Sequence, residues 1–123
     1  MAKKIMIVDD EANVCKTVKL ILEGEGFEVV TASSGPEALK KLGDEKVDLA
    51  LLDFLMPEMS GRVLAEEIRK DQELKDLKLA FLTVATFGET GMDELQGLEI
   101  LDHILKPFDS EDLVKRVKRM VGA

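Results

Sequence analysis

The sequence is poor in several residues that mark particular classes of protein. Its 123 residues include one cysteine, Cys15, and no tryptophan or tyrosine. A lone cysteine excludes an intramolecular disulfide and fits a reducing compartment, so we expect a thiol packed on a helix rather than a nucleophile. Asp9 and Asp10 interrupt the N-terminal apolar run well short of a signal-peptide core, and no other run is long enough to span a membrane. We therefore expect a cytoplasmic protein.

Positive charge is also scarce. The chain has 17 lysines and arginines against 25 aspartates and glutamates, a formal net charge of −8. This excess repels phosphate backbones and anionic lipids, so neither nucleic acid nor membrane is expected as a direct partner. The length and the hydrophobic fraction of 46% are typical of one globular domain, here residues 1–123.

Short apolar runs alternate with amphipathic segments along the chain. The apolar runs predict strands at Lys4–Val8, 27–32, 48–54, Lys78–Thr83 and 102–105. Helices are predicted over 12–25, from a serine cap at 33 or 34 to about Leu42, after Gly61, within 84–101 and from a capping Ser110 onward. The helix in 84–101 is expected to be short or mobile because glycines and threonines interrupt its pattern. The alternation predicts an α/β fold with one doubly wound, five-stranded parallel sheet and five helices on both of its faces.

Chemically active side chains follow four of the predicted strands. They are Asp9 and Asp10, Asp53, Thr83, and Lys106. The carboxyl ends of parallel strands meet in one crevice, so we expect these groups to converge. Crowded carboxylates resist ionisation unless a cation lies between them, and Mg²⁺ prefers oxygen ligands and leaves room for a phosphate oxygen. The pattern predicts a Mg²⁺ site.

Asp53 is the candidate nucleophile, because a carboxylate can accept a phosphoryl group as an aspartyl-phosphate. Lys106 would place a positive charge on one phosphate oxygen, and Thr83 would donate its hydroxyl to another. Each residue alone also has an ordinary interpretation, as a solvated strand end, a turn residue or an exposed lysine. Their joint occurrence at strand ends favours the functional interpretation.

Four motifs resemble the receiver domains of two-component response regulators, in the order of that family and along almost the whole chain. They are Val8-Asp9-Asp10-Glu11, the segment from Asp53 to Gly61 with Pro57 inside it, Leu82-Thr83, and Leu105-Lys106-Pro107-Phe108. The resemblance implies a flavodoxin-like strand order 2-1-3-4-5. It also implies that Asp53 is phosphorylated, with Asp10, Asp53 and the Leu55 backbone carbonyl as direct Mg²⁺ ligands and Asp9 acting through water. Lys106 and Thr83 carry over as phosphate contacts, and the Lys106–Pro107 bond is expected to be cis.

The function implied by this resemblance is that of a signalling switch. A sensor histidine kinase or phosphotransfer protein donates the phosphoryl group, and Thr83 repositions. The face formed by 84–101, 102–105 and the final helix then shifts to control a downstream protein or effector domain. Such a domain, a monomer or weak dimer, catalyses only its own phosphoryl transfer and slow self-dephosphorylation.

Three other functions are weighed against it. One is an interaction module of the same fold that binds its partner without phosphorylation. Another is a phosphohydrolase, but Phe54 and Leu55 follow Asp53, so the Asp-x-Asp arrangement of haloacid-dehalogenase-like phosphatases is missing. A nucleotide-binding protein is not supported either, because no Walker-type glycine-rich loop follows a strand.

Two positions, 103 and 84, depart from the family pattern, and two more residues bear on the lifetime of the phosphoryl group. His103, the only histidine, stands where receivers commonly carry an aromatic switch residue, and a role as switch and a role as a plain exposed strand residue are equally compatible with the sequence. If it is a switch, its exposure changes on phosphorylation. Val84 is bulky where the family usually has a small residue, which would restrict access to the pocket. Leu55 and Ala85 are apolar and cannot orient a hydrolytic water, so slow self-dephosphorylation is predicted.

Overall fold

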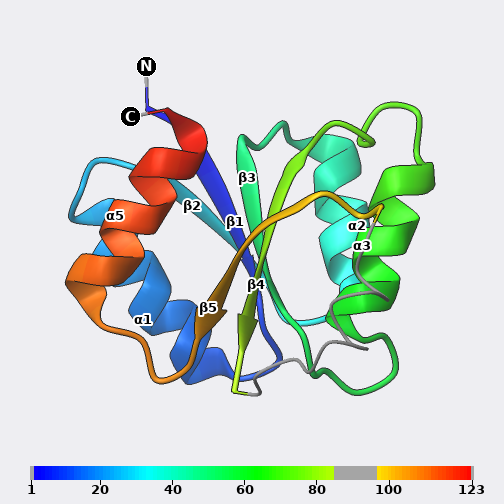
Figure 1. Cartoon of the computed structure of the whole chain (residues 1–123). Helices are drawn as coiled ribbons and strands as arrows, with labels where there is room; N and C mark the ends of the chain where they lie inside the picture. Colours follow the sequence, from blue (N-terminus) through cyan, green and yellow to red (C-terminus); the bar gives the residue numbers. More distant parts are fainter. Residues whose placement is uncertain (1, 85–96, 123) are drawn as a thin grey trace.

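The computed structural model describes residues 2–84 and 97–122. Five strands form one parallel sheet in the order β2-β1-β3-β4-β5 (Figure 1). The strands are β1 Lys4–Val8, β2 Glu28–Ala32, β3 Leu49–Asp53, β4 Lys78–Thr83 and β5 Ile100–Leu105, and the helices are α1 Ala12–Glu23, α2 Gly35–Asp44, α3 Gly61–Lys70 and α5 Ser110–Val121. The predicted fold class and strand order are confirmed. Four helices lie in the described residues, while the helix expected within 84–101 falls mainly on 85–96, outside them.

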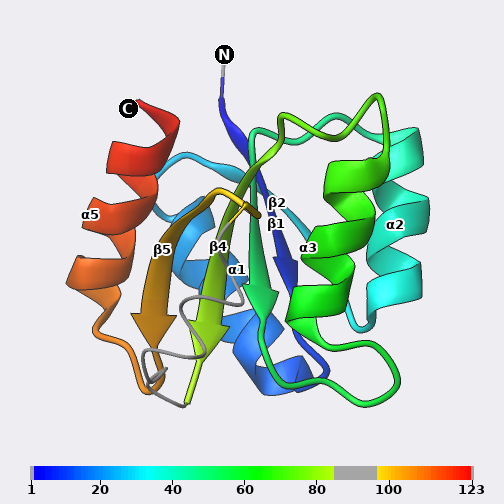
Figure 2. The ribbon, with the colours of Figure 1, turned by 45° about the vertical axis from the view of Figure 1, so that its right-hand side comes forward.

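The helices cover the sheet from both sides, with α2 and α3 on one face and α1 and α5 on the other (Figure 2). Alternate residues of each central strand therefore enter different cores. In β1, Met6 packs with the α2 and α3 side, whereas Ile5 and Ile7 pack with the α1 and α5 side. All three are fully buried. Burial on both faces explains why the central strands are continuous apolar runs rather than alternating ones.

The helix starts follow the capping signals in the sequence, with one correction. Ser34 caps α2 by accepting a hydrogen bond from the Glu37 backbone N–H at 3.2 Å. At α5 the cap is Asp109 and not Ser110, because the Asp109 carboxylate accepts the Asp112 backbone N–H at 3.0 Å. Aspartate caps a helix as well as serine does, so the helix starts with Ser110 as its first residue.

Strand β5 begins two residues before the predicted start at 102. Ile100 pairs with Leu79 and His103 with Phe81, so the register is irregular between these pairs. Such an irregularity breaks the alternation of side chains on which the sequence prediction depends. Among the described residues, no helix has both the length and the apolar character needed to cross a bilayer.

Candidate functional site

The sheet register brings the predicted site residues to one edge. Val8 pairs with Leu52, and Asp53 pairs with Leu82, so β1, β3 and β4 end side by side. At the neighbouring position Thr83 pairs with Leu105, and its carbonyl accepts the Lys106 backbone N–H at 2.8 Å. The convergence expected from strand ends is therefore what the structure shows.

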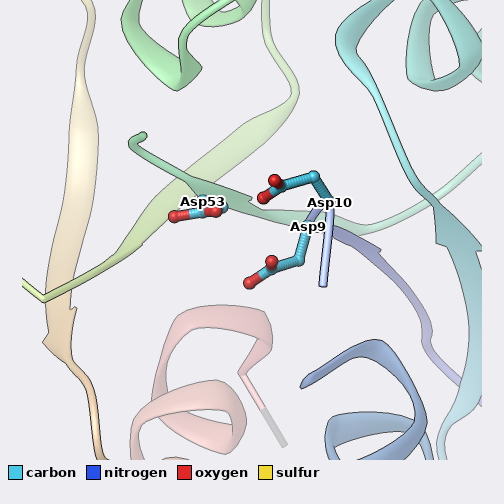
Figure 3. Close-up of side chains that lie close together, drawn as sticks. All are labelled: Asp9, Asp10 and Asp53. Atoms are coloured by element: carbon cyan, nitrogen blue, oxygen red, sulfur yellow. The ribbon is translucent and has the colours of Figure 1, made fainter. Parts of the chain in front are cut away.

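Asp9, Asp10 and Asp53 form an acidic cluster (Figure 3). One oxygen from each lies within 4.8 Å of the others. Asp9 and Asp53 are buried, whereas Asp10 is exposed, so the cluster is open to solvent on one side. An all-carboxylate donor set with access to water fits a hard divalent cation such as Mg²⁺, which retains several of its waters.

Lys106 supplies the positive charge next to this cluster. Its Nζ donates to Asp9 Oδ2 at 2.6 Å and lies 3.5 Å from Asp53 Oδ1. The other Asp9 oxygen, Oδ1, accepts the Glu11 backbone N–H at 2.9 Å. Both oxygens of Asp9 are thus engaged by donors of the protein itself, and a buried carboxylate is stabilised only by such partners.

Burial and charge crowding set the protonation states at the site. Burial, and then the negative charge of Asp9, raise the pKa of Asp53 to about 6, while Lys106 and the Leu55 N–H act in the opposite direction. Burial disfavours the charged form of Lys106, but the Asp9 hydrogen bond and the two aspartate charges outweigh it and raise the pKa of the lysine. The site therefore holds a firmly charged lysine beside a carboxyl group that titrates close to neutrality.

The loop that follows Asp53 is anchored close to the site. The Leu55 backbone N–H donates to Asp53 Oδ1 at 3.3 Å, and the Leu55 side chain is exposed. Gly61 donates its N–H to the Phe54 carbonyl at 2.9 Å, and a Cβ at Gly61 would lie 2.4 Å from the Asp53 carbonyl oxygen. Only glycine permits this approach. Gly61 closes one of the four sequence motifs, but nothing in the sequence indicates this role.

The remaining predicted residues lie around the same edge. Thr83 is buried at the end of β4, and the Lys106–Pro107 peptide bond is cis, as predicted. The His103 ring is partly buried 5.8 Å from the Phe81 ring, and its burial lowers its pKa although Asp102 opposes this. Val84 is exposed and lines a cavity of about 450 Å³ with Lys106. Ala85 lies outside the described residues.

Comparison with known proteins agrees with this geometry. The family model of the response regulator receiver domain matches residues 5–118. The chain belongs to the response regulator receiver family. It is 36% identical over 124 residues to the alkaline phosphatase synthesis transcriptional regulatory protein PhoP of Bacillus subtilis, covering 98% of this chain and 49% of PhoP. It is 37% identical over 123 residues to the phosphate regulon transcriptional regulatory protein PhoB of Pseudomonas aeruginosa, covering 98% and 52%.

Solved structures give the same result. The receiver domain superimposes on the chemotaxis protein CheY4 of Vibrio cholerae with a TM-score of 0.91 at 30% identity, covering 98% of this chain and 99% of the other. The response regulator TrrA of Thermotoga maritima, solved in complex with Mg²⁺-BeF, has a TM-score of 0.82 at 37% identity, covering 96% and 98%. The receiver domain thus spans nearly all of these two chains but about half the length of the curated relatives it matches.

Proposed function

We propose that this receiver domain is the phosphoacceptor switch of a two-component phosphorelay. Asp53 attacks the phosphorus of a phosphohistidine on a sensor kinase or phosphotransfer protein. The N–P bond breaks, a bond from the Asp53 carboxylate to phosphorus forms, and the histidine recovers its nitrogen lone pair. The observation that carries the proposal is a buried carboxylate, Asp53, which lies 3.5 Å from Lys106 and within 4.8 Å of two further acids.

Each residue has a separate role in this proposal. Asp10, Asp53 and the Leu55 carbonyl would hold Mg²⁺ directly, and the ion supplies positive charge to the phosphoryl oxygens when bound. Asp9 would act through water, which is supported by the engagement of both its oxygens by Lys106 and Glu11. Lys106 stabilises the transferred phosphoryl group, as a cation that is already held in position.

Thr83 would connect the site to the rest of the domain. Its hydroxyl donates to a phosphoryl oxygen, and its movement shifts the face that includes β5 and α5 between two populations. His103 lies on β5 beside this path and would change its exposure with the shift. A downstream protein or an attached effector domain would recognise the shifted face, and the two curated relatives are both named as transcriptional regulators.

Treatment with acetyl phosphate and Mg²⁺ tests the proposal directly. We expect intact-mass spectrometry to show one added phosphoryl group on the wild type and none on Asp53→Ala, because Asp9, the other carboxylate beside Lys106, has both of its oxygens engaged by Lys106 and the Glu11 backbone N–H. Asp76→Ala, which removes an exposed acid, should be modified like the wild type. An unmodified wild type, together with no Mg²⁺-dependent binding of beryllofluoride, would favour the phosphorylation-independent interaction module.

Self-dephosphorylation is predicted to be slow. The exposed Leu55 side chain borders Asp53 and offers no group that could orient an attacking water. We expect the phosphoryl group to persist for many minutes after the acyl-phosphate donor is removed, as followed by mass spectrometry. Leu55→Asn should shorten its lifetime, whereas Leu55→Met should not. A wild-type half-life of seconds would contradict the prediction.

A further inference from the structure

Gly35, the first residue of α2, stands where the helix itself does not require glycine. It is buried, and its φ angle lies outside the left-handed region that favours glycine. The helix start is already well formed, because Ser34 provides the cap and the Glu37 carboxylate accepts the Ser33 backbone N–H at 2.6 Å. Glycine is a weaker helix former than alanine, so another feature must account for it.

That feature is Met59, which belongs to the loop between β3 and α3 and covers Gly35. A Cβ at Gly35 would lie 2.3 Å from Met59 Sδ, 2.9 Å from its Cγ and 3.1 Å from its Cβ. Real Cβ atoms essentially never show contacts as short as the first two, and the third is tighter than most real Cβ contacts. The Sδ and Cγ atoms, which carry the two shortest contacts, are the ones that Met59→Ala removes. Met59 is partly buried against the core on the α2 and α3 face. The start of α2 and the β3–α3 loop lie at the same edge of the molecule (Figure 2).

The loop that Met59 anchors has a demanding backbone conformation. Glu58 adopts a positive φ of 68°, and the Met59 N–H donates to the Pro57 carbonyl at 2.7 Å, which closes a tight three-residue turn. A non-glycine residue at positive φ persists only where its surroundings hold it. Leu55, at the other end of this loop, donates its backbone N–H to Asp53. The packing of Met59 on Gly35 therefore holds the segment that runs beside the acidic cluster.

We propose that the close contact between Gly35 and Met59 positions the β3–α3 loop for metal binding. Gly35 is then a positioning residue for the site, although it belongs to α2 and is not itself one of the proposed metal ligands. A side chain at position 35 pushes Met59 outward and carries the loop, with the Leu55 backbone, away from Asp53. The inference rests on the proposed Mg²⁺ site.

The test is a double-mutant cycle on the whole chain, with Mg²⁺ alone as the ligand. We expect Gly35→Ala to raise the Kd for Mg²⁺ about tenfold in isothermal titration calorimetry, as for loss of a group that orients a metal ligand. Met59→Ala should weaken binding less. Gly35→Ala combined with Met59→Ala should restore the affinity to that of Met59→Ala or better, since the new methyl group then occupies the vacated space.

Gly43→Ala is the matched control, because Gly43 lies in the same helix and a Cβ there would meet nothing within 4 Å. It should leave the Kd unchanged. The rescue separates the proposal from the strain that any side chain meets before Pro36, because shortening Met59 does not relieve that strain. In metal-free protein, the amide NMR signals of Leu55 and Glu58 should shift in Gly35→Ala and not in Gly43→Ala.

The outcomes distinguish this inference from the proposed function. If the wild type binds no Mg²⁺, both are wrong. If the wild type binds Mg²⁺ and Gly35→Ala binds it equally well, only the positioning role is wrong, even if the variant melts at a lower temperature. A double variant as weak as Gly35→Ala would also overturn the role. If Gly35→Ala does not fold, the Kd of Met59→Ala for Mg²⁺ is the deciding measurement. A value equal to that of the wild type overturns the inference.

Discussion

Replacing Lys106 by methionine is expected to slow the phosphorylation of Asp53 by acetyl phosphate about a hundredfold, as for loss of one preorganised group that stabilises the transition-state charge. Methionine keeps the length of the side chain but removes the Nζ that lies 2.6 Å from Asp9 and 3.5 Å from Asp53. Two buried carboxylates then face the incoming phosphoryl group without that cation. Time-resolved intact-mass spectrometry at saturating Mg²⁺ measures the rate.

The same substitution is expected to lower the free energy of unfolding by about 3 kcal/mol in the absence of metal, because it leaves the buried charge of Asp9 without its positively charged partner. Lys118→Met is the control, since it also removes a lysine from an ion pair. Lys118 Nζ lies 2.9 Å from Glu25, and both side chains of this pair are exposed to solvent. The control should change neither the rate of Asp53 phosphorylation nor the free energy of unfolding appreciably. Phosphorylation of Lys106→Met at the wild-type rate would show that the lysine does not stabilise the reaction.

Replacing Asp53 by asparagine is expected to stabilise the metal-free protein by about 2 to 3 kcal/mol above pH 7, since one pKa unit corresponds to about 1.4 kcal/mol. The fold raises the pKa of Asp53 from 3.8 to about 6, so the folded state binds this proton more tightly than the unfolded state does. Ionised Asp53 therefore opposes folding at pH values above about 6, and the opposition disappears as the pH falls through 6 towards 4. The advantage of asparagine should vanish over the same range.

Urea unfolding with a chelator present, at about pH 7.5 and about pH 4.5, measures this difference. The exposed Asp76→Asn removes the same charge and should change the free energy of unfolding by less than about 0.5 kcal/mol. Added Mg²⁺ should reverse the order at neutral pH, because a ligand that binds only the folded wild type stabilises it. If Asp53→Asn is less stable than the wild type in chelator at pH 7.5, burial and the charge of Asp9 do not destabilise the ionised form of Asp53.

The fold was predictable because local and long-range signals agree at most positions. The run from Leu49 to Leu52 is apolar throughout, as a strand covered on both faces must be, and it lies in the middle of the sheet. The two errors have different causes. Asp109 and Ser110 can both cap a helix, and the start of β5 depends on its irregular pairing with β4, which one strand's sequence does not contain.

The sequence was sufficient to predict which strand ends carry the site residues and that these residues converge. Parallel topology brings Asp53 next to the acids that follow β1, and the structure places Lys106 in contact with Asp53 and with Asp9. The sequence did not show which of the acids is buried and which is exposed, because the burial of Asp9 and the exposure of Asp10 depend on neighbours far away in the sequence. The packing of Met59 over Gly35 could not be predicted for the same reason, since it joins the β3–α3 loop to the start of α2, and no local pattern encodes the distance between them.

The start of β1 and the end of α5 lie together at one edge of the sheet (Figure 1), and the acidic cluster follows the opposite ends of the strands. Lys78, at the start of β4, donates its Nζ to the Met120 carbonyl near the end of α5, which fixes the C-terminal helix at that edge. A five-residue strand separates the two edges by about 15 Å. A dye or an immobilising tether attached next to the start of β1 or the end of α5 therefore leaves the edge that carries Asp53 open, so a sensor-chip assay can test candidate kinases without masking the proposed phosphoacceptor.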